Sequence, residues 1–163
     1  MDTKLHELFI DQLRDAYDAE HRILEALPKK IKAAQSEELR SGLEQHLAET
    51  QEQVNRLEKV FTSLDIEAKR NTCEATKGLI KEAEELLSDF EGSSAIDAAI
   101  VCAGQKIEHY EIATYGCLCT WAKQMGHDEA FVLLHETLEE EKAADEILSR
   151  AAIGEANLVA NDQ

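Results

Sequence analysis

Residues that break helices are scarce in this sequence. It contains one proline and seven glycines among 163 residues, although both types are frequent in turns and between strands. The long stretches between them are rich in Ala, Leu, Glu and Lys, which favour helices. This scarcity excludes a protein built from many short strands. It predicts an all-α fold in a single domain, since 163 residues is the length of one ordinary domain.

Positive charge is also scarce. The chain has 17 Lys and Arg residues against 34 Asp and Glu residues, which gives a formal net charge of −17. Such a charge opposes binding to nucleic acid or to an anionic membrane surface, and it favours cationic ligands and metal ions. Most of these acids are expected to form solvated helix faces.

The sequence lacks long apolar runs and a cysteine pattern. No stretch approaches the roughly 20 apolar residues that a membrane span needs, and residues 1–7 do not read as a signal peptide. A soluble, cytoplasmic protein is therefore expected. The four cysteines fit no zinc template and are expected to be reduced thiols; they are Cys73, Cys102, Cys117 and Cys119.

Apolar residues recur at intervals of three and four along most of the chain. This period predicts four long helices, over about residues 2–34, from a turn at 35–38 to about 64, over 95–124 and over 128–153. A short helix over 74–90 lies in a crossover of about 30 residues, which lets the second and third long helices run parallel. Residues 1–155 are expected to form the helical domain and residues 156–163 a frayed tail.

Glutamates occupy positions on the apolar stripes of three of these helices. Counted in helical steps, Glu20, Glu111 and Glu141 each fall between apolar residues of their own stripe. Glu108 lies one turn before Glu111 and can share the same interior. Burying an uncompensated charge costs several kcal/mol, so such residues normally have partners or bind a metal.

The two halves of the chain overlay in one register. Glu20 and Glu49 are separated by 29 residues, and so are Glu111 and Glu140. This spacing indicates a duplicated helical hairpin, in which each hairpin contributes a core glutamate from its first helix and acids from its second. A long crossover between two such hairpins is the layout of a ferritin-like antiparallel four-helix bundle.

Carboxylates on facing helices are the ligands that a pair of Fe or Mn ions requires, because hard oxygen donors neutralise the four positive charges and bridge both metals. Such bundles usually combine a glutamate from each of two helices with a Glu-x-x-His pair from each of the others. No histidine follows Glu49, Glu140 or Glu141 at that spacing. His46, one turn before Glu49, and Asp145, four residues after Glu141, are candidates to supply a further ligand.

The candidate site residues fall into two groups. The predicted metal ligands are Glu20, Glu49, Glu108, Glu111 and Glu141. Candidates for an additional ligand, or for a residue that hydrogen-bonds to a ligand, are His46, Gln53, Glu140, Asp145, Tyr17 and Tyr115. The alternative is a helix-face acid paired with Lys or Arg, or, for the tyrosines, packing in the core. Glu140, the repeat equivalent of Glu49, competes with Glu141 for one position.

Four segments carry a resemblance to a known family. They are 18–21 (Asp-Ala-Glu-His), 46–50 (His-Leu-Ala-Glu-Thr), 106–116 (Lys-Ile-Glu-His-Tyr-Glu-Ile-Ala-Thr-Tyr-Gly) and 137–145 (Thr-Leu-Glu-Glu-Glu-Lys-Ala-Ala-Asp). Over about residues 3–152 the chain resembles the YciE/YciF-type bacterial stress proteins, a branch of the ferritin-like superfamily. The resemblance implies a four-helix bundle with an extra short helix, a homodimer and a rubrerythrin-like dinuclear metal centre.

Two functions from different classes compete at this point. The first is a cytoplasmic protein that binds two metal ions, Fe or alternatively Mn, and oxidises Fe(II) or reduces O₂ or peroxide during stress. The second is a non-enzymatic, dimeric helical stress protein with a degenerate metal site, which the missing Glu-x-x-His pairs favour.

Overall fold

The structure is a computed structural model that describes residues 3–161, and within this range it contains helices and no strands. The all-α prediction is thereby confirmed. The long helices are α1 (Lys4–Ala33), α2 (Glu37–Ser63), α4 (Ile96–Met125) and α5 (Asp128–Ala151). The shorter elements are α3 (Glu74–Asp89), a π-helical turn η1 (Ala152–Ala156) and α6 (Asn157–Asn161).

Local sequence sets where these helices begin and end. The Thr3 side chain accepts a hydrogen bond from the His6 backbone N–H at 3.2 Å, and the Ser36 side chain caps α2 in the same way. Each cap satisfies a backbone donor that the first helical turn leaves free. At the end of α4, Gly126 adopts a left-handed conformation with φ 76°, which glycine reaches without steric cost.

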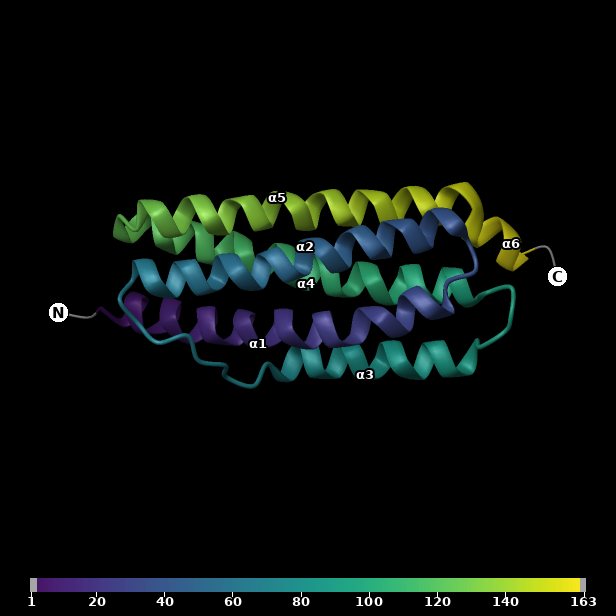
Figure 1. Ribbon diagram of the computed structural model, residues 1–163, viewed down its shortest axis with the longest axis horizontal. Coiled ribbons are helices and arrows are strands. Elements are labelled where there is room, and N and C mark those ends of the chain that lie inside the picture. Colours follow the sequence, from purple (N-terminus) through teal and green to yellow (C-terminus); the bar gives the residue numbers. More distant parts are fainter. Residues whose placement is uncertain (1–2, 162–163) are drawn as a thin grey trace.

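The four long helices lie side by side along their length (Figure 1). α1 and α2 run in opposite directions, as do α4 and α5, whereas α2 and α4 run in the same direction (Figure 1). Contacts join α1 to α2, α2 to α5, α5 to α4 and α4 to α1, which closes the ring. The connection from α2 to α4 runs the length of the molecule and carries α3, which packs on α1 and α4.

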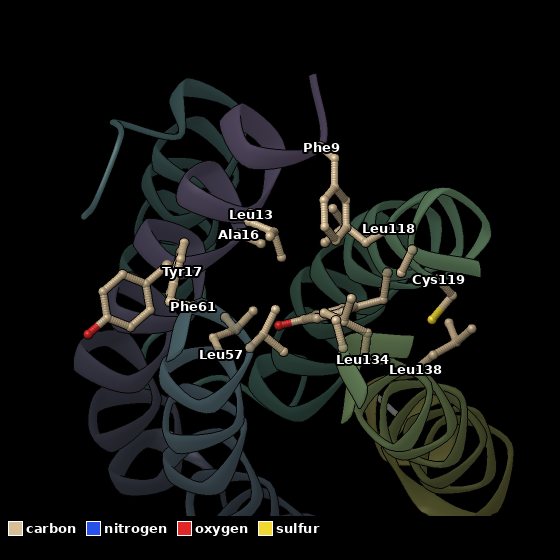
Figure 2. Close-up of a cluster of buried hydrophobic side chains, with 14 of the residues drawn as sticks. Phe9, Leu13, Ala16, Tyr17, Leu57, Phe61, Leu118, Cys119, Leu134 and Leu138 are labelled. Atoms are coloured by element: carbon tan, nitrogen blue, oxygen red, sulfur yellow. The ribbon is translucent and has the colours of Figure 1, made fainter. Parts of the chain in front are cut away.

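The interior is divided into two apolar clusters. One, centred on Phe9, Leu13, Phe61 and Leu118, fills the end of the molecule near the start of α1 (Figure 2). The other contains Ile23, Leu27, Leu43, Ile100 and Leu148. On every long helix, residues of the first cluster and residues of the second flank a short polar stretch. The polar stretches therefore form a layer between the two clusters.

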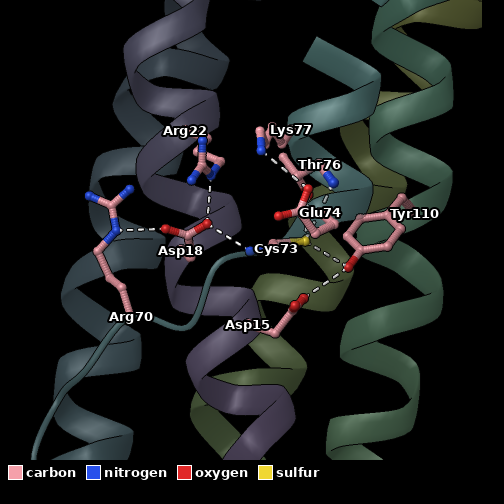
Figure 3. Close-up of polar contacts among 9 residues, drawn as sticks. All are labelled: Asp15, Asp18, Arg22, Arg70, Cys73, Glu74, Thr76, Lys77 and Tyr110. Carbon is pink, nitrogen blue, oxygen red and sulfur yellow. Dashed lines mark hydrogen bonds and ion pairs between the residues drawn. The ribbon is translucent and has the colours of Figure 1, made fainter. Parts of the chain in front are cut away.

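A buried ion-pair network fastens the α2–α3 connection to α1 (Figure 3). Asp18 accepts hydrogen bonds from the Arg22 side chain at 2.5 Å, from the Arg70 side chain at 2.9 Å and from the Cys73 backbone N–H at 2.9 Å. Burial alone would raise the pKa of Asp18, but the Cys73 N–H and the two guanidinium groups hold it below its usual value. All polar demands of this buried carboxylate are thus met.

The thiol of Cys73 lies beside this network and belongs to a second chain of contacts. Its Sγ atom is 3.1 Å from the Tyr110 hydroxyl, which donates a hydrogen bond to Asp15 at 3.0 Å (Figure 3). Cys73 also accepts a hydrogen bond from the Thr76 backbone N–H and so caps α3. These contacts hold α1, α3 and α4 together at one level of the molecule.

Residues 156–161 differ from the frayed tail that the sequence predicted. After α5 the chain makes the π-helical turn and then the short helix α6, and both contact α4. Ala156 is 4% exposed. Burial of this small side chain gives the tail an anchor that composition does not reveal. Residues 162 and 163 lie outside the described part of the chain.

Candidate metal centre

Each long helix contributes to the polar layer. Glu20 comes from α1, His46 from α2, Glu108 and Glu111 from α4, and Glu141 from α5. Their exposed fractions lie between 0% and 7%. Helical periodicity places all five on the inward face, because each has apolar core residues one turn away on the same face.

The layer brings potential ligand atoms together at one point. His46, Glu108, Glu111 and Glu141 each offer one atom, and these atoms all lie within 4.8 Å of one another. The His46 Nε2 atom is 3.2 Å from Glu108 Oε1. Glu20 borders the group, and its Oε1 atom accepts a short hydrogen bond from the Tyr115 hydroxyl. Tyr115 thus hydrogen-bonds to a predicted ligand, which is one of the two roles that the sequence suggested for it.

Most of the polar atoms in the layer have no hydrogen-bond partner. Within the described residues, this holds for Glu20 Oε2, Glu108 Oε2, both nitrogens of His46, and both carboxyl oxygens of Glu111 and of Glu141. Buried polar atoms are nearly always paired, since each unpaired one costs about 1–3 kcal/mol. So many unpaired carboxylate oxygens and imidazole nitrogens, gathered at one point, fit the ligands of a divalent cation better than they fit a structural core.

The acidity of the four glutamates reflects their burial and their closeness to one another. Burial, together with the charge of Glu141, raises the pKa of Glu20 to about 8. Burial also raises the pKa of Glu108 to about 7, and it raises those of Glu111 and Glu141 well above the usual value. Without a cation, these groups therefore retain protons near neutral pH, because burial disfavours the charged form and charged carboxylates this close together repel.

His46 is neutral at pH 7, because burial lowers its pKa. Its contact with Glu108 is consequently not an ion pair. Neutral imidazole is the form that binds metals. The residue was proposed as an additional ligand from its position one turn before Glu49, and the structure places it within the group that Glu49 was expected to join.

Two of the five predicted ligands are not among the four converging residues: Glu20, which borders them, and Glu49. Glu49 is half-buried, and its carboxylate accepts a hydrogen bond from the Gln45 side chain at 2.8 Å. Glu49 lies three residues after His46, about 60° around α2 and so on nearly the same face. It stands at the edge of that face, where Gln45 binds its carboxylate outside the group.

Glu140 is likewise turned away from the layer. Its two carboxylate oxygens accept hydrogen bonds from the Arg56 guanidinium at 2.7 and 2.6 Å, and Gln53 donates a third at 3.0 Å. The geometry therefore places Glu141 in the layer and Glu140 in an ion pair between α2 and α5. Gln53 serves that ion pair, although its Oε1 atom is buried without a partner.

The two remaining candidates lie away from the group. The Tyr17 hydroxyl donates to Glu58 on α2 at 2.9 Å, so its ring packs in the core while its polar end points elsewhere. This hydrogen bond joins Tyr17 to a residue outside the group of four. Asp145 is half-buried and lies 3.2 Å from the His109 Nε2 atom. Its charge acts on Glu108, but Asp145 is not one of the four converging residues.

Sequence reasoning missed Lys30, which is buried next to the layer with 5% of its surface exposed. Burial lowers the pKa of its ammonium group, against the opposing charges of Glu108 and Glu111. A signal was present, since Lys30 continues the inward stripe of Ile23 and Leu27. It was hidden because lysines near a helix end usually reach solvent.

Comparison with known proteins agrees with this architecture. A family model described as "Domain of unknown function (DUF892)" matches residues 4–161. Protein YciF of Escherichia coli (strain K12) is 42% identical over 160 residues, which cover 98% of this chain and 96% of the relative. The chain therefore belongs to this family, and its resemblance to YciF-type proteins is confirmed.

Solved structures show the same fold. The crystal structure of the E. coli stress protein YciF matches with a TM-score of 0.89 and 41% identity over 100% of both chains. YcfI of Rhodopseudomonas palustris, described as a candidate structural protein, matches with a TM-score of 0.88 and 44% identity over 91% of this chain and 94% of its own. No helix among the described residues is long and apolar enough to cross a membrane.

Proposed function

We propose that this protein is a ferritin-like metal carboxylate protein that binds two divalent ions, iron in the first place, and uses them to oxidise Fe(II) or to reduce O₂ or peroxide during stress. The proposal rests on the buried oxygen and nitrogen atoms without hydrogen-bond partners on Glu108, Glu111, Glu141 and His46. Four carboxylates, with Glu20 included, match the charge of two divalent ions. The homodimer implied by the family resemblance stays a prediction.

The chain's own residues have distinct parts in this proposal. Glu108, Glu111, Glu141 and His46 would hold the metal, which supplies redox and Lewis-acid chemistry when bound. Tyr115 fixes the orientation of Glu20 through its hydroxyl. The two apolar clusters on either side exclude water from the layer, so the electrostatic attraction between carboxylates and cations is strong there.

Metal binding would also release protons. Because the pKa values of Glu20 and Glu108 are raised to about 8 and about 7, these groups hold protons at neutral pH that a cation must displace. Affinity should therefore increase as the pH rises from 6 to 8.

A second candidate is a non-enzymatic helical protein with a degenerate site. The specific observation in its favour is that Glu49 and Glu140, the two glutamates matched by the internal repeat, bind Gln45 and Arg56 rather than the layer. The description of the R. palustris relative as a candidate structural protein points the same way.

Metal analysis separates the two candidates. Protein purified without chelator is analysed for Fe and Mn, and then titrated anaerobically with Fe(II) before exposure to O₂ or peroxide. We expect bound metal, and a loss of at least about 100-fold in affinity when Glu111→Gln removes one ligand. Glu44→Gln, at an exposed position on α2, is the matched control. Absence of bound metal in the wild type, or equal affinity in both variants, would leave the non-enzymatic candidate.

A further inference from the structure

Lys30 is a buried cation that the proposed metal chemistry does not use. It lies ten residues after Glu20 on α1, nearly three helical turns further along. Within the described residues, no hydrogen bond or ion pair holds its ammonium group, although the charges of Glu108 and Glu111 act on it. A buried charge without a direct partner is costly. Its three N–H groups are therefore available to a ligand that reaches them.

A pocket adjoins this lysine. It has a volume of about 30 Å³, and its lining includes Lys30, His46 and Glu108 together with apolar side chains from all four long helices. Gln45 and Glu49 also line it, and Gln45 is exposed. The pocket thus leads from the surface of α2 to the His46–Glu108 edge of the polar layer.

The size and chemistry of the pocket restrict what it can hold. One water needs about 10–15 Å³ of such volume, so about 30 Å³ accommodates two or three non-hydrogen atoms. The polar part of the lining includes Lys30, His46 and Glu108, and the other walls are mostly Ile, Leu, Ala and Gly. The Lys30 ammonium can only donate hydrogen bonds, so it selects a ligand with an electron-rich acceptor end. Dioxygen is a poor acceptor and does not meet this requirement.

We propose that this pocket binds a peroxide, or an anion of the same two-to-three-atom size, and that Lys30 is the residue that selects it. The inference rests on the proposed function in so far as the ligand would lie beside the metal site. It deepens that function, because it distinguishes peroxide from dioxygen as the molecule that the protein holds. A peroxide and a small anion both carry a hydrogen-bond acceptor that the Lys30 ammonium group can stabilise.

Azide is a suitable probe, because it is a three-atom anion whose infrared stretching band shifts when it binds. Metal-free protein is titrated with azide for the wild type, Lys30→Met and the control Lys106→Met, whose lysine is exposed on α4 and paired with Glu82. We expect a shifted, saturable band in the wild type and the control. In Lys30→Met the azide affinity should fall at least about tenfold.

A second variant keeps the test decisive if Lys30→Met does not fold. Ala144→Val retains the lysine and places two methyl groups in the pocket, so it should also weaken azide binding while circular dichroism stays unchanged. No shifted band in the wild type, or equal azide affinity in a folded Lys30→Met or Ala144→Val, would overturn the proposal.

Competition identifies the source of the ligand. If hydrogen peroxide displaces azide from metal-free protein, the pocket binds peroxide; if nitrite displaces azide and peroxide does not, it binds a small anion. The readout needs no metal, so it is independent of the metal analysis. Metal binding without azide binding would refute only the pocket, and azide binding without metal binding would refute only the proposed metal function.

Discussion

Asp18 and Glu20 lie two residues apart on α1, and both carboxylates are buried, yet their surroundings are opposite. Asp18 accepts hydrogen bonds from two arginines and a backbone N–H, and its pKa is lowered. Glu20 has one short hydrogen bond from Tyr115 and a pKa raised to about 8. Two positions along a helix differ by about 200°, so one carboxylate faces the α2–α3 connection and the other faces the interior.

Hydrogen-bond partners distinguish structural from functional acids in this fold. A buried carboxylate with all its acceptor sites filled stabilises the fold by joining segments, and its removal leaves other groups unpaired. A buried carboxylate with empty acceptor sites lowers stability, unless something outside the chain fills them. The network in Figure 3 is of the first kind, and the layer around Glu111 is of the second.

The largest expected effect concerns Asp18. Asp18→Asn should lower the free energy of unfolding by about 3 kcal/mol, because the charge that holds Arg22 and Arg70 is lost inside the structure. Metal affinity should change less than about threefold, since Asp18 does not face the layer. Urea unfolding of metal-free protein measures the first quantity, and calorimetric titration with metal measures the second. An unchanged free energy of unfolding would show that the hydrogen bonds of Asp18 do not stabilise the fold.

A somewhat smaller effect is expected on changing the pH of metal-free protein. The raised pKa values of Glu20 and Glu108 mean that the folded state binds more protons than the unfolded state between about pH 4.5 and pH 8. Stability is therefore highest below this window and falls as the pH rises through it. From pH 5.5 to pH 8, Tm should drop by about 5 °C.

Variants sharpen the pH experiment. Glu20→Gln should flatten part of the slope, because it removes one of the groups that lose protons in this window. Asp18→Asn should leave the slope unchanged, since the lowered pKa of Asp18 places its titration below pH 3.8. A Tm that rises with pH in the wild type would show that the layer is not composed of repelling carboxylates.

The smallest effect is expected at Glu140, the neighbour of Glu141. Glu140→Gln weakens a half-buried ion pair with Arg56, so it should cost about 1 kcal/mol of stability. It should change metal affinity less than about threefold. Glu141→Gln, by contrast, should reduce metal affinity by at least about 100-fold. Equal effects of the two variants on metal affinity would reverse the assignment of Glu141 to the layer.

The sequence predicted the helices and much of the layer for a physical reason. Helical periodicity is local, so the inward positions of Glu20, Glu108, Glu111 and Glu141 follow from counting residues along each helix. The direction of α4 followed from the length of the crossover that carries α3. The tail after residue 155 was not predictable, because the burial of Ala156 depends on a contact with another part of the fold.

Side-chain pairing was the part that sequence reasoning could not resolve. The 29-residue repeat gave Glu49 and Glu140 equivalent status, but Gln45 binds Glu49 at the edge of its helix face, and Arg56 on the opposing helix binds Glu140. The inward position of Lys30 was readable from its stripe, whereas its lack of a partner was not. A sequence pattern gives the face of a helix, and the partners on that face come from elements distant in sequence.

The position of Cys73 under α3 has a consequence for the reactivity of the chain. Its thiol is 0% exposed, and burial raises its pKa, so the reactive thiolate is suppressed while α3 stays docked. Cys102 and Cys117 are exposed by comparison. An alkylating reagent would therefore modify those two thiols directly, whereas its reaction with Cys73 would report the rate at which α3 and the connection lift away from α1. The alkylation rate of Cys73 therefore measures local opening next to α1, the helix that supplies Glu20.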